Sequence, residues 1–497
     1  MQGPNGRNSI SDASSIQAPF FANQSCDPFT SPEVSCHYGN YVRYAVNVST
    51  PDDVAATIAF AKEHNIRFVI RNTGHDYLGR STGAGAISVW THYLKDINFL
   101  DWDDVNYTGK AVKVGAGVQG YEVLSAAKDE GLVVLTGECP SVGIAGGYTQ
   151  GGGHSALATS FGLLADNTLQ FEVITADGRF VTASPSENPD LYWALSGEGA
   201  GNYAVVYSMT VKAHPDAYVG GAIIEISSAG VSNDTFYKSV HAFFSGLTAM
   251  IDGGSMIIAV LTPTSLQVGP VTAYNKTAAE VETTLNPFLN ALTNLNITYS
   301  VNYTESATYY DHYISYFGPV PEGKFGLVGV AQYGGRLIPG STFDGNTTAW
   351  VETLRFILDL GAGNVTFVAT DVSRFAGNGK NAVLSAWRGD SGPVIHSFPS
   401  TPWSFDPSEW GQMLAYQKIM TNTIIPALEA VTPGSGAYMN EADFLQPNFQ
   451  QVFYGSQYER LLEIKNKHDP DSVFYATKGV GSEAWTVAKD GHMCTAR

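Results

Sequence analysis

The sequence predicts an α+β protein with two domains and a C-terminal segment. The chain has 497 residues, of which 44% are hydrophobic, and this is more than one simple core requires. Short strand-turn-helix patterns occupy residues 45–212, whereas longer strand and helix patterns alternate over residues 213–430. We therefore divide the chain into residues 1–212, 213–430 and 431–497.

The first helix is expected directly after Thr50. Thr50 offers a capping hydroxyl, Pro51 suits the first turn, and two aspartates follow at the positive end of the helix dipole. A strand is expected at 66–70, after apolar residues at helical spacing. Residues 170–182 predict a hairpin, because their Asp-Gly pair accepts positive φ at little cost.

The middle of the chain predicts strands separated by helices, and the tail predicts one more helix. The expected strands include 221–224, 256–261, 325–331 and 365–369. The expected helices lie near 234–247, 278–293, 348–360, 408–430 and 458–468. We find no internal repeat and no low-complexity segment.

The formal charge of −19 argues against several classes of partner. With 27 basic and 46 acidic side chains, the protein repels nucleic-acid backbones and anionic membrane surfaces. No uninterrupted apolar stretch reaches the roughly 18–20 residues that span a bilayer. We therefore expect neither a nucleic acid nor a membrane as a partner.

Cysteine spacing and glycosylation sequons indicate the secretory route. Cys26 and Cys36 are close enough to staple a short loop by a disulfide. No signal peptide is visible at the N-terminus, so we expect a processed, secreted, monomeric protein that carries N-linked glycans. The nine sequons begin at Asn23, Asn47, Asn106, Asn233, Asn275, Asn296, Asn302, Asn346 and Asn364.

A G-x-G-x-x-G motif at Gly115–Gly120 offers a possible dinucleotide site. Its amides and the following helix could hold a pyrophosphate. However, the motif is short in a chain with 52 glycines, and it lacks a clean βαβ unit with an acidic residue at the end of the second strand. We interpret it as a structural turn.

His75 and Cys139 each lie in a glycine-rich turn that follows an apolar strand pattern. The His75 turn presents amides, a hydroxyl and a cation that together suit a pyrophosphate. Amide donors around Cys139 would favour its thiolate, and the dense glycines after it indicate close approach of a ligand or another backbone. The residues of the first turn are Arg71, Asn72, Thr73, Gly74, His75 and Asp76.

Other interpretations of these two residues remain open. His75 could be an ordinary hydrogen-bonded histidine, and Cys139 a buried inert cysteine. Metal binding is less well supported, because His92 and His154 lack the usual ligand spacing. A Cys-His protease is a further option, although neither turn offers an obvious orienting partner.

Four long segments follow one another in the order IRNTGHDYLGRS, TGECPSVGIAGGYTQGGGHSALATSFGLLADN, YMNEADF and YERLLEIKNKHDP. Together they resemble the berberine-bridge-enzyme-like branch of the vanillyl-alcohol-oxidase flavoproteins. The resemblance covers about residues 45–215 and 430–480. It implies an FAD-binding domain built from both ends of the chain and an inserted α+β substrate domain, an antiparallel sheet covered by helices. It also implies covalent bonds from His75 and Cys139 to the flavin.

The resemblance implies roles for further residues. Tyr77 and Tyr438 would be catalytic, with Tyr438 helping to deprotonate the substrate only if its pKa, ordinarily about 10, is lowered. Asn440 would lie near the cofactor. The other cofactor-binding positions would be Ser81, Gly137, Val142, Gly143, Gly146, Gly147, Gly152, His154 and Asn167.

This chain also departs from the family pattern. His154 replaces the phenylalanine of a common G-G-G-F-G segment, Glu441 follows Asn440, and residues 196–202 replace the usual third glycine segment. The carboxylate that some members carry on the substrate domain has no motif. Candidates for this base are Asp311, Asp390 and His396.

Together these observations predict a secreted FAD-dependent oxidase with doubly attached flavin and no metal. It would remove a hydride from an alcohol, sugar or phenol and reduce O2 to hydrogen peroxide. One alternative is an oxidative ring-closing or desaturating flavoenzyme of secondary metabolism. Another is a non-catalytic flavin- or carbohydrate-binding glycoprotein.

Overall fold

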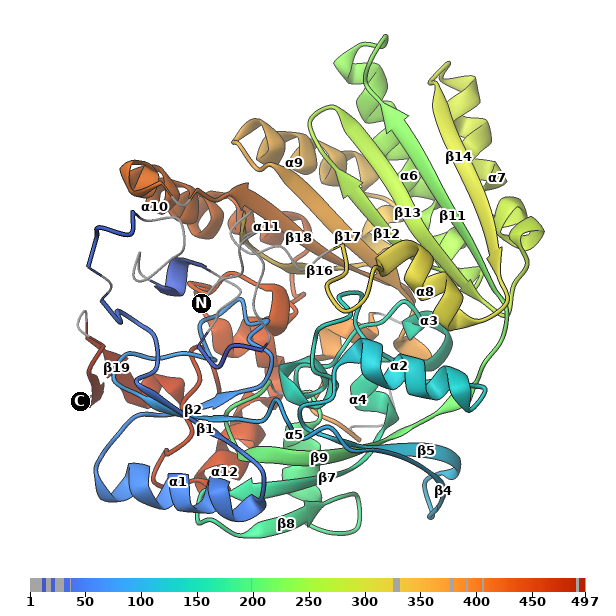
Figure 1. Ribbon diagram of the computed structural model, residues 1–497. Helices are drawn as coiled ribbons and strands as arrows, with labels where there is room; N and C mark the ends of the chain where they lie inside the picture. The colour runs from blue at the N-terminus through green and yellow to red at the C-terminus, as the bar shows by residue number, and fades with distance from the viewer. Residues whose placement is uncertain are drawn as a thin grey trace.

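Three main sheets and the helices that cover them make up most of the protein (Figure 1). The computed structural model describes residues 11–14, 19–22, 31–35, 37–197, 199–324, 331–375, 380–389, 392–404, 406–488 and 491–496. Cys26 and Cys36, and with them the predicted disulfide, lie outside the described residues, as do Asn23, Asp390 and residues 325–330 of one predicted strand.

The first helix and one strand of the first sheet confirm the sequence prediction, whereas the other two strands were not predicted. Helix α1 (Pro51–Glu63) begins after Thr50, whose side chain accepts a hydrogen bond from the Asp53 amide. The sheet then forms from β1 (Tyr44–Asn47), β2 (Phe68–Arg71) and β3 (Ile87–Trp90), which are parallel in the order β1-β3-β2. Strand β2 ends at Arg71, so the His75 turn follows directly from the end of this strand.

A five-stranded antiparallel sheet lies beneath the first one in Figure 1. Its order is β4 (Ile97–Asp103), β5 (Thr108–Gly115), β9 (Ala204–Lys212), β7 (Thr168–Thr175) and β8 (Phe180–Ala183). The pairing of β7 with β8 confirms the predicted hairpin.

The Gly115–Gly120 motif is a structural turn and not part of a βαβ unit. It joins β5 to α2 (Gly120–Asp129), and β5 is antiparallel to both of its neighbours. A Cβ atom on Gly117 would lie 2.3 Å from the carbonyl oxygens of Thr91 and His92. Close packing of the chain therefore explains this glycine.

The middle of the chain folds into one large antiparallel sheet. Helices α6 (Asn233–Asp252), α7 (Ala278–Asn294) and α9 (Thr347–Asp359) cover one of its faces (Figure 1). The strand order is β14 (Tyr299–Ser306), β11 (Val219–Ser227), β13 (Ser265–Tyr274), β12 (Met256–Leu261), β17 (Asn364–Thr370), β18 (Val394–Pro402) and β15 (Ala331–Tyr333), and β16 (Arg336–Pro339) also pairs with β18.

Most predicted elements of this part are confirmed, but some strands were missed. The helix predicted at 408–430 is present as α10 (Trp410–Ile419) and α11 (Ile425–Val431), joined by a π-helical turn. Strands β13 and β18 contain Pro270 and Pro399, and proline ordinarily argues against a central strand. Their prolines explain why the sequence pattern did not reveal them.

The C-terminal segment packs back onto the N-terminal part of the chain. In Figure 1 its red ribbon lies among the blue elements, with α12 (Tyr458–His468) beside them. The Tyr203 hydroxyl donates to the Leu461 carbonyl over 2.9 Å, and the Lys465 ammonium donates to the Asn202 carbonyl over 2.7 Å. The two ends of the chain thus share one hydrophobic core.

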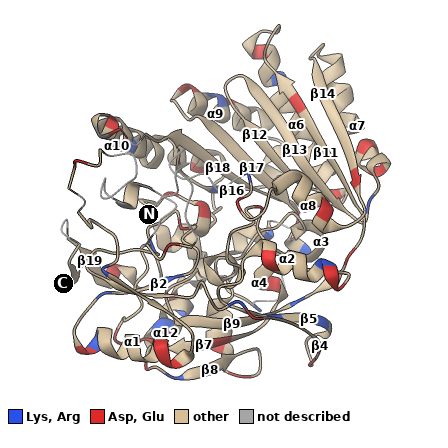
Figure 2. Ribbon diagram, viewed as in Figure 1, with Lys and Arg blue, Asp and Glu red and all other residues tan. Residues whose placement is uncertain are grey.

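Charged residues avoid the central strands of the large sheet (Figure 2). Strands β12, β13, β17 and β18 contain no Lys, Arg, Asp or Glu. Among the described residues, no helix combines the length and the apolar character needed to cross a membrane.

Candidate active site

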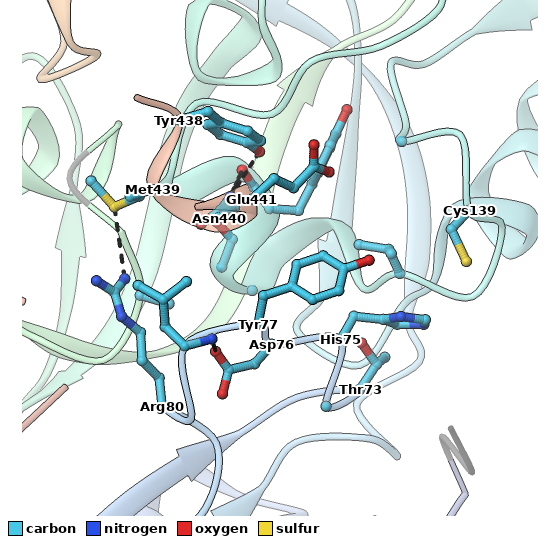
Figure 3. A pocket seen from close by; sticks show the side chains of 18 of the residues that line it. Thr73, His75, Asp76, Tyr77, Arg80, Cys139, Tyr438, Met439, Asn440 and Glu441 are labelled. Carbon is cyan, nitrogen blue, oxygen red and sulfur yellow. Dashed lines mark hydrogen bonds between the residues drawn. The ribbon is translucent and has the colours of Figure 1, made fainter. Parts of the chain in front are cut away.

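A cavity of about 580 Å³ lies where the N-terminal part, the large sheet and the C-terminal segment meet. The N-terminal part contributes the turns around His75 and Cys139. The sheet contributes residues of β12, β17 and β18, and the tail contributes Tyr438–Glu441. Figure 3 shows His75 and Cys139 on one side of the cavity, and Tyr438 with Glu441 away from them.

His75 and Cys139 are linked through one serine hydroxyl. The His75 Nε2 atom lies 2.9 Å from the Ser141 Oγ atom, and the Cys139 Sγ atom lies 3.5 Å from the same oxygen. Burial and the nearby positive charge of Arg71 lower the pKa of His75 to about 4. The imidazole is therefore neutral at physiological pH and keeps a lone pair for bonding.

The His75 turn is held in shape by Asp76. Its carboxylate accepts hydrogen bonds from the Leu78 amide over 2.9 Å and the Ser81 amide over 2.8 Å. Gly74 has a φ of 81°, a conformation that favours glycine. These hydrogen bonds and the glycine conformation fix the shape of the turn, whose residues line the cavity.

The cavity has features that suit a flavin dinucleotide. A Cβ atom on Gly143 would lie 1.8 Å from Asn72 Oδ1, so only glycine lets the two turns approach so closely. Among the described residues, Asn72 Oδ1, Arg80 Nη2 and Gln150 Oε1 are buried polar atoms without a hydrogen-bond partner, and all three residues line the cavity. Such atoms call for a polar ligand, so the residues present fit FAD.

Four acid and base side chains form a connected group beside the cavity. His154 Nδ1 lies 3.2 Å from Glu138 Oε2, and His154 Nε2 lies 3.3 Å from Glu441 Oε1. His396 Nε2 lies 2.8 Å from Glu441 Oε2. We call these four residues the Glu-His group.

The charges of the Glu-His group reinforce one another. Burial alone would lower the pKa of His154, but Glu138 and Glu441 outweigh it and raise that pKa well above its ordinary value. Burial alone would raise the pKa of Glu441, but the charge and hydrogen bond of His154 hold it well below its ordinary value. The group therefore holds an imidazolium and an ionised carboxylate.

Tyr438 is a neutral phenol in this structure. Its hydroxyl accepts a hydrogen bond from Asn440 Nδ2 over 2.8 Å. Burial and the negative charge of Glu441 raise the pKa of Tyr438 well above its ordinary value. The structure thus does not supply the lowered pKa that a role for Tyr438 as base requires.

Tyr77, which follows the His75 turn, also lines the cavity. Its ring meets the ring of Tyr333 edge to face, with 4.8 Å between their centroids. Asn440 donates to the Gly147 carbonyl over 2.8 Å and so ties the tail to the second glycine turn.

Most of the predicted site residues come together here, but three do not line the cavity. Arg71 lies behind the His75 turn and donates to the Asp12 carbonyl. Asn167 bonds to His214 and Gly152 packs near Leu163. The predicted residues that do line it are Asn72, Thr73, Gly74, His75, Asp76, Tyr77, Ser81, Gly137, Cys139, Val142, Gly143, Gly146, Gly147, His154, Tyr438 and Asn440.

Of the candidate bases on the substrate domain, His396 contacts Glu441 within the Glu-His group, whereas Asp311 bonds to Lys128 at an exposed surface. The sequence did not assign Ser141, Glu138 or Glu441 to the site. In the sequence, Glu441 is notable only because it departs from the family pattern after Asn440. Among the described residues, no three His, Cys, Asp or Glu side chains are placed to hold a metal ion.

The fold and this cavity define an FAD-binding oxidoreductase of the vanillyl-alcohol-oxidase type, and comparison with known proteins agrees. A family model described as "FAD binding domain" matches residues 42–184, and one described as "Berberine and berberine like" matches residues 437–481. The chain belongs to the berberine-bridge-enzyme-like FAD-linked oxidoreductases, and it is an enzyme.

Individual relatives cover almost the whole chain. The FAD-linked oxidoreductase ZEB1 of Gibberella zeae is 54% identical over 98% of this chain and 84% of the relative. The bifunctional decalin synthase calF of Penicillium decumbens is 38% identical over 98% of this chain and 85% of the relative.

Solved structures confirm the predicted fold. The VAO-type flavoprotein MtVAO615 from Myceliophthora thermophila is 40% identical, with a TM-score of 0.94 over 99% of this chain and 89% of that one. Glucooligosaccharide oxidase from Acremonium strictum shares the fold at 18% identity, with a TM-score of 0.69 over 89% of this chain and 92% of that one.

Proposed function

We propose that the protein is an FAD-dependent oxidase whose flavin is bonded to both His75 and Cys139. The observation that carries this proposal is the shared contact of both side chains with the Ser141 hydroxyl at the cavity wall. The neutral state of His75 leaves its imidazole nucleophilic. Glucooligosaccharide oxidase is described as having a 6-S-cysteinyl, 8α-N1-histidyl FAD, which involves the same pair of residue types.

The chemistry that we propose is oxidation of an alcohol, a sugar or a phenol. FAD, held by the turns of His75 and Cys139, would supply the hydride acceptor, and O2 would be the final oxidant, with hydrogen peroxide as its product. The protein side chains orient the cofactor and hold a carboxylate at the cavity wall. Oxidative ring closure or desaturation is the second candidate function, which the name of the decalin synthase relative favours.

Denaturation tests the attachment. A yellow colour that stays with acid-precipitated protein supports covalent FAD, and release of all colour into the supernatant contradicts it. His75→Ala and Cys139→Ala should each leave one attachment, which mass spectrometry of flavin-bearing peptides resolves. Peroxide release over a panel of sugars, alcohols and phenols then tests the oxidase activity.

We further propose that the protein is secreted and glycosylated. Of the nine sequon asparagines, eight are described, and seven of these are exposed. The eighth, Asn364, is half-buried at the cavity, where a glycan would obstruct access. Mass spectrometry of the protein from its native source should find glycans at exposed sequons and none at Asn364.

A further inference from the structure

We propose that the substrate is a largely apolar, ring-containing alcohol or phenol that binds through one hydroxyl group, which donates a hydrogen bond to Glu441. This inference rests on the proposed function, because it assigns the substrate class of the same cavity. It distinguishes between the sugars, alcohols and phenols that the redox chemistry alone would allow.

Strands β12, β17 and β18 form one wall of the cavity, on which side chains of neighbouring strands lie in cross-strand rows. Alternate residues of β12, β17 and β18 point into the cavity, and their neighbours point into the core under the helices. The cross-strand rows, starting beside the Glu-His group, are Ile258–Val368–His396, Val260–Thr366–Phe398 and Asn364–Ser400.

These rows change from apolar to polar with distance from Glu441. Apart from the fully buried His396, which is not among the cavity-lining residues, the first two rows present aliphatic side chains and one aromatic ring with a single hydroxyl, that of Thr366. Rows two residues apart are about 7 Å apart, so these two rows match the length of a six-membered ring or a fused pair. Tyr77 and Tyr333 add aromatic surface.

A sugar is a poor match for this wall. Each sugar hydroxyl that leaves water needs a new hydrogen-bond partner, and an unpaired one costs about 1–3 kcal/mol. The first two rows could pair only one such group. The third row, with Asn364 and Ser400, suits a polar substituent at the far end of the substrate.

Glu441 is the most exposed of the three residues of the Glu-His group that line the cavity, the other two being Glu138 and His154. Its side chain is 24% exposed, compared with 12% for Glu138, 6% for His154 and 0% for His396. An ionised carboxylate only accepts hydrogen bonds, so its partner must donate. A hydroxyl meets this requirement, whereas an anionic substrate would be repelled by both glutamates.

The groups around Glu441 keep it ionised. His154 faces it as a cation, and His396 bonds to it as a neutral imidazole whose pKa burial lowers. Burial and Glu441 raise the pKa of Tyr333 to about 12, so this phenol stays neutral. Among the described residues, His154 and His396 are the only basic side chains within ion-pair distance of Glu441.

The experiment measures binding of three probes to the FAD-loaded protein, both by the flavin absorbance change and by calorimetry. The probes are naphthol, its methyl ether and cellobiose. Naphthol should bind at least about tenfold more tightly than the methyl ether, because a hydrogen bond to a charged group is worth this much. Cellobiose should not bind at concentrations at which naphthol saturates the protein.

Two variants distinguish the contribution of the Glu441 carboxylate to binding from that of the apolar wall. Glu441→Gln should reduce the preference for naphthol over its ether to threefold or less. Val368→Thr, which keeps the shape of the wall but adds a hydroxyl, should weaken both naphthalene probes equally and leave their ratio unchanged.

Three results would overturn the inference: tighter binding of cellobiose than of naphthol, equal binding of naphthol and its ether by the unchanged protein, or no binding of either naphthalene compound by calorimetry. The unchanged protein alone supplies these comparisons, so they stand even if a variant does not fold. Loss of flavin on denaturation would instead contradict the proposed function and leave the binding comparison intact.

Discussion

The Nε2 atom of His75 lies 2.9 Å from the hydroxyl oxygen of Ser141. This oxygen is also 3.5 Å from the Cys139 sulfur, so one hydroxyl orients both proposed attachment residues. Both side chains line the same cavity although they are 64 residues apart in sequence (139 − 75). Their proximity is the basis of the first prediction.

Ser141→Ala should reduce the fraction of doubly attached flavin and destabilise the fold by about 1–3 kcal/mol, because a buried His75 nitrogen loses its partner. Peptide mass spectrometry gives the attachment and urea unfolding gives the stability. Ser239→Ala is the matched control, since Ser239 is a buried serine that bonds to Phe236 within α6. It should lower stability only. Equal attachment in both variants would count against the role of Ser141.

Gly143→Ala should prevent FAD binding, while Gly147→Ala should be tolerated. The new Cβ atom would overlap Asn72 Oδ1 at 1.8 Å in the first variant, but would lie 3.6 Å from the Ala200 Cβ atom in the second. Overpacking of this kind typically costs about 1–3 kcal/mol. The ratio of flavin absorbance to protein absorbance measures the outcome, and similar ratios would show that the two turns can move apart.

Loss of His154 should destabilise the protein in a pH-dependent way. A raised histidine pKa gives stability that is complete below about pH 6.5 and declines as pH rises through the higher folded-state value. A lowered Glu441 pKa gives stability that is present above about pH 4.3 and is lost at lower pH. His154→Gln should therefore cost most, about 3–5 kcal/mol, between these limits.

Denaturant unfolding from pH 5 to pH 9 measures this difference. His214→Gln is the control, because burial and Lys212 lower the pKa of His214 to about 4, and this side chain hydrogen-bonds to the neutral amide of Asn167. Its cost should not change from pH 7 upward. A His154→Gln cost that is constant over the same range would show that His154 is not charged in the folded protein.

Arg388→Met should destabilise the protein by about 3–5 kcal/mol, because it leaves a buried carboxylate without its partner. Arg388 joins the substrate domain to Asp166 by two hydrogen bonds of 2.6 and 2.8 Å. The control Lys62→Met removes an exposed ion pair with Asp471 and should cost about 0–1 kcal/mol. Chemical denaturation compares them, and equal costs would mean that this contact between the domains is weak.

Tyr438→Phe should leave the alkaline limb of the pH profile unchanged, because the pKa of this phenol is raised. The measurement is peroxide release at several pH values with the best substrate of the panel. Loss of the alkaline limb in this variant would identify Tyr438 as a base that ionises during turnover.

Local patterns were sufficient for much of the fold. The Thr50 cap, the Asp-Gly hairpin and the long helices α6, α7 and α9 are confirmed, because each depends on residues that are neighbours in sequence. Strands β13 and β18 depend on pairing with distant strands, which overrides the unfavourable prolines that they contain.

The sequence by itself determined the family, the cofactor and the two glycine-rich turns, since long ordered motifs carry that information. Only the tertiary structure decided that Ser141 links His75 to Cys139 and that Glu138, His154, His396 and Glu441 form one group. The longest of these contacts, between His154 and Glu441, joins residues that are 287 apart in sequence. Their burial and charge, which shift the pKa values, arise only when the chain is folded.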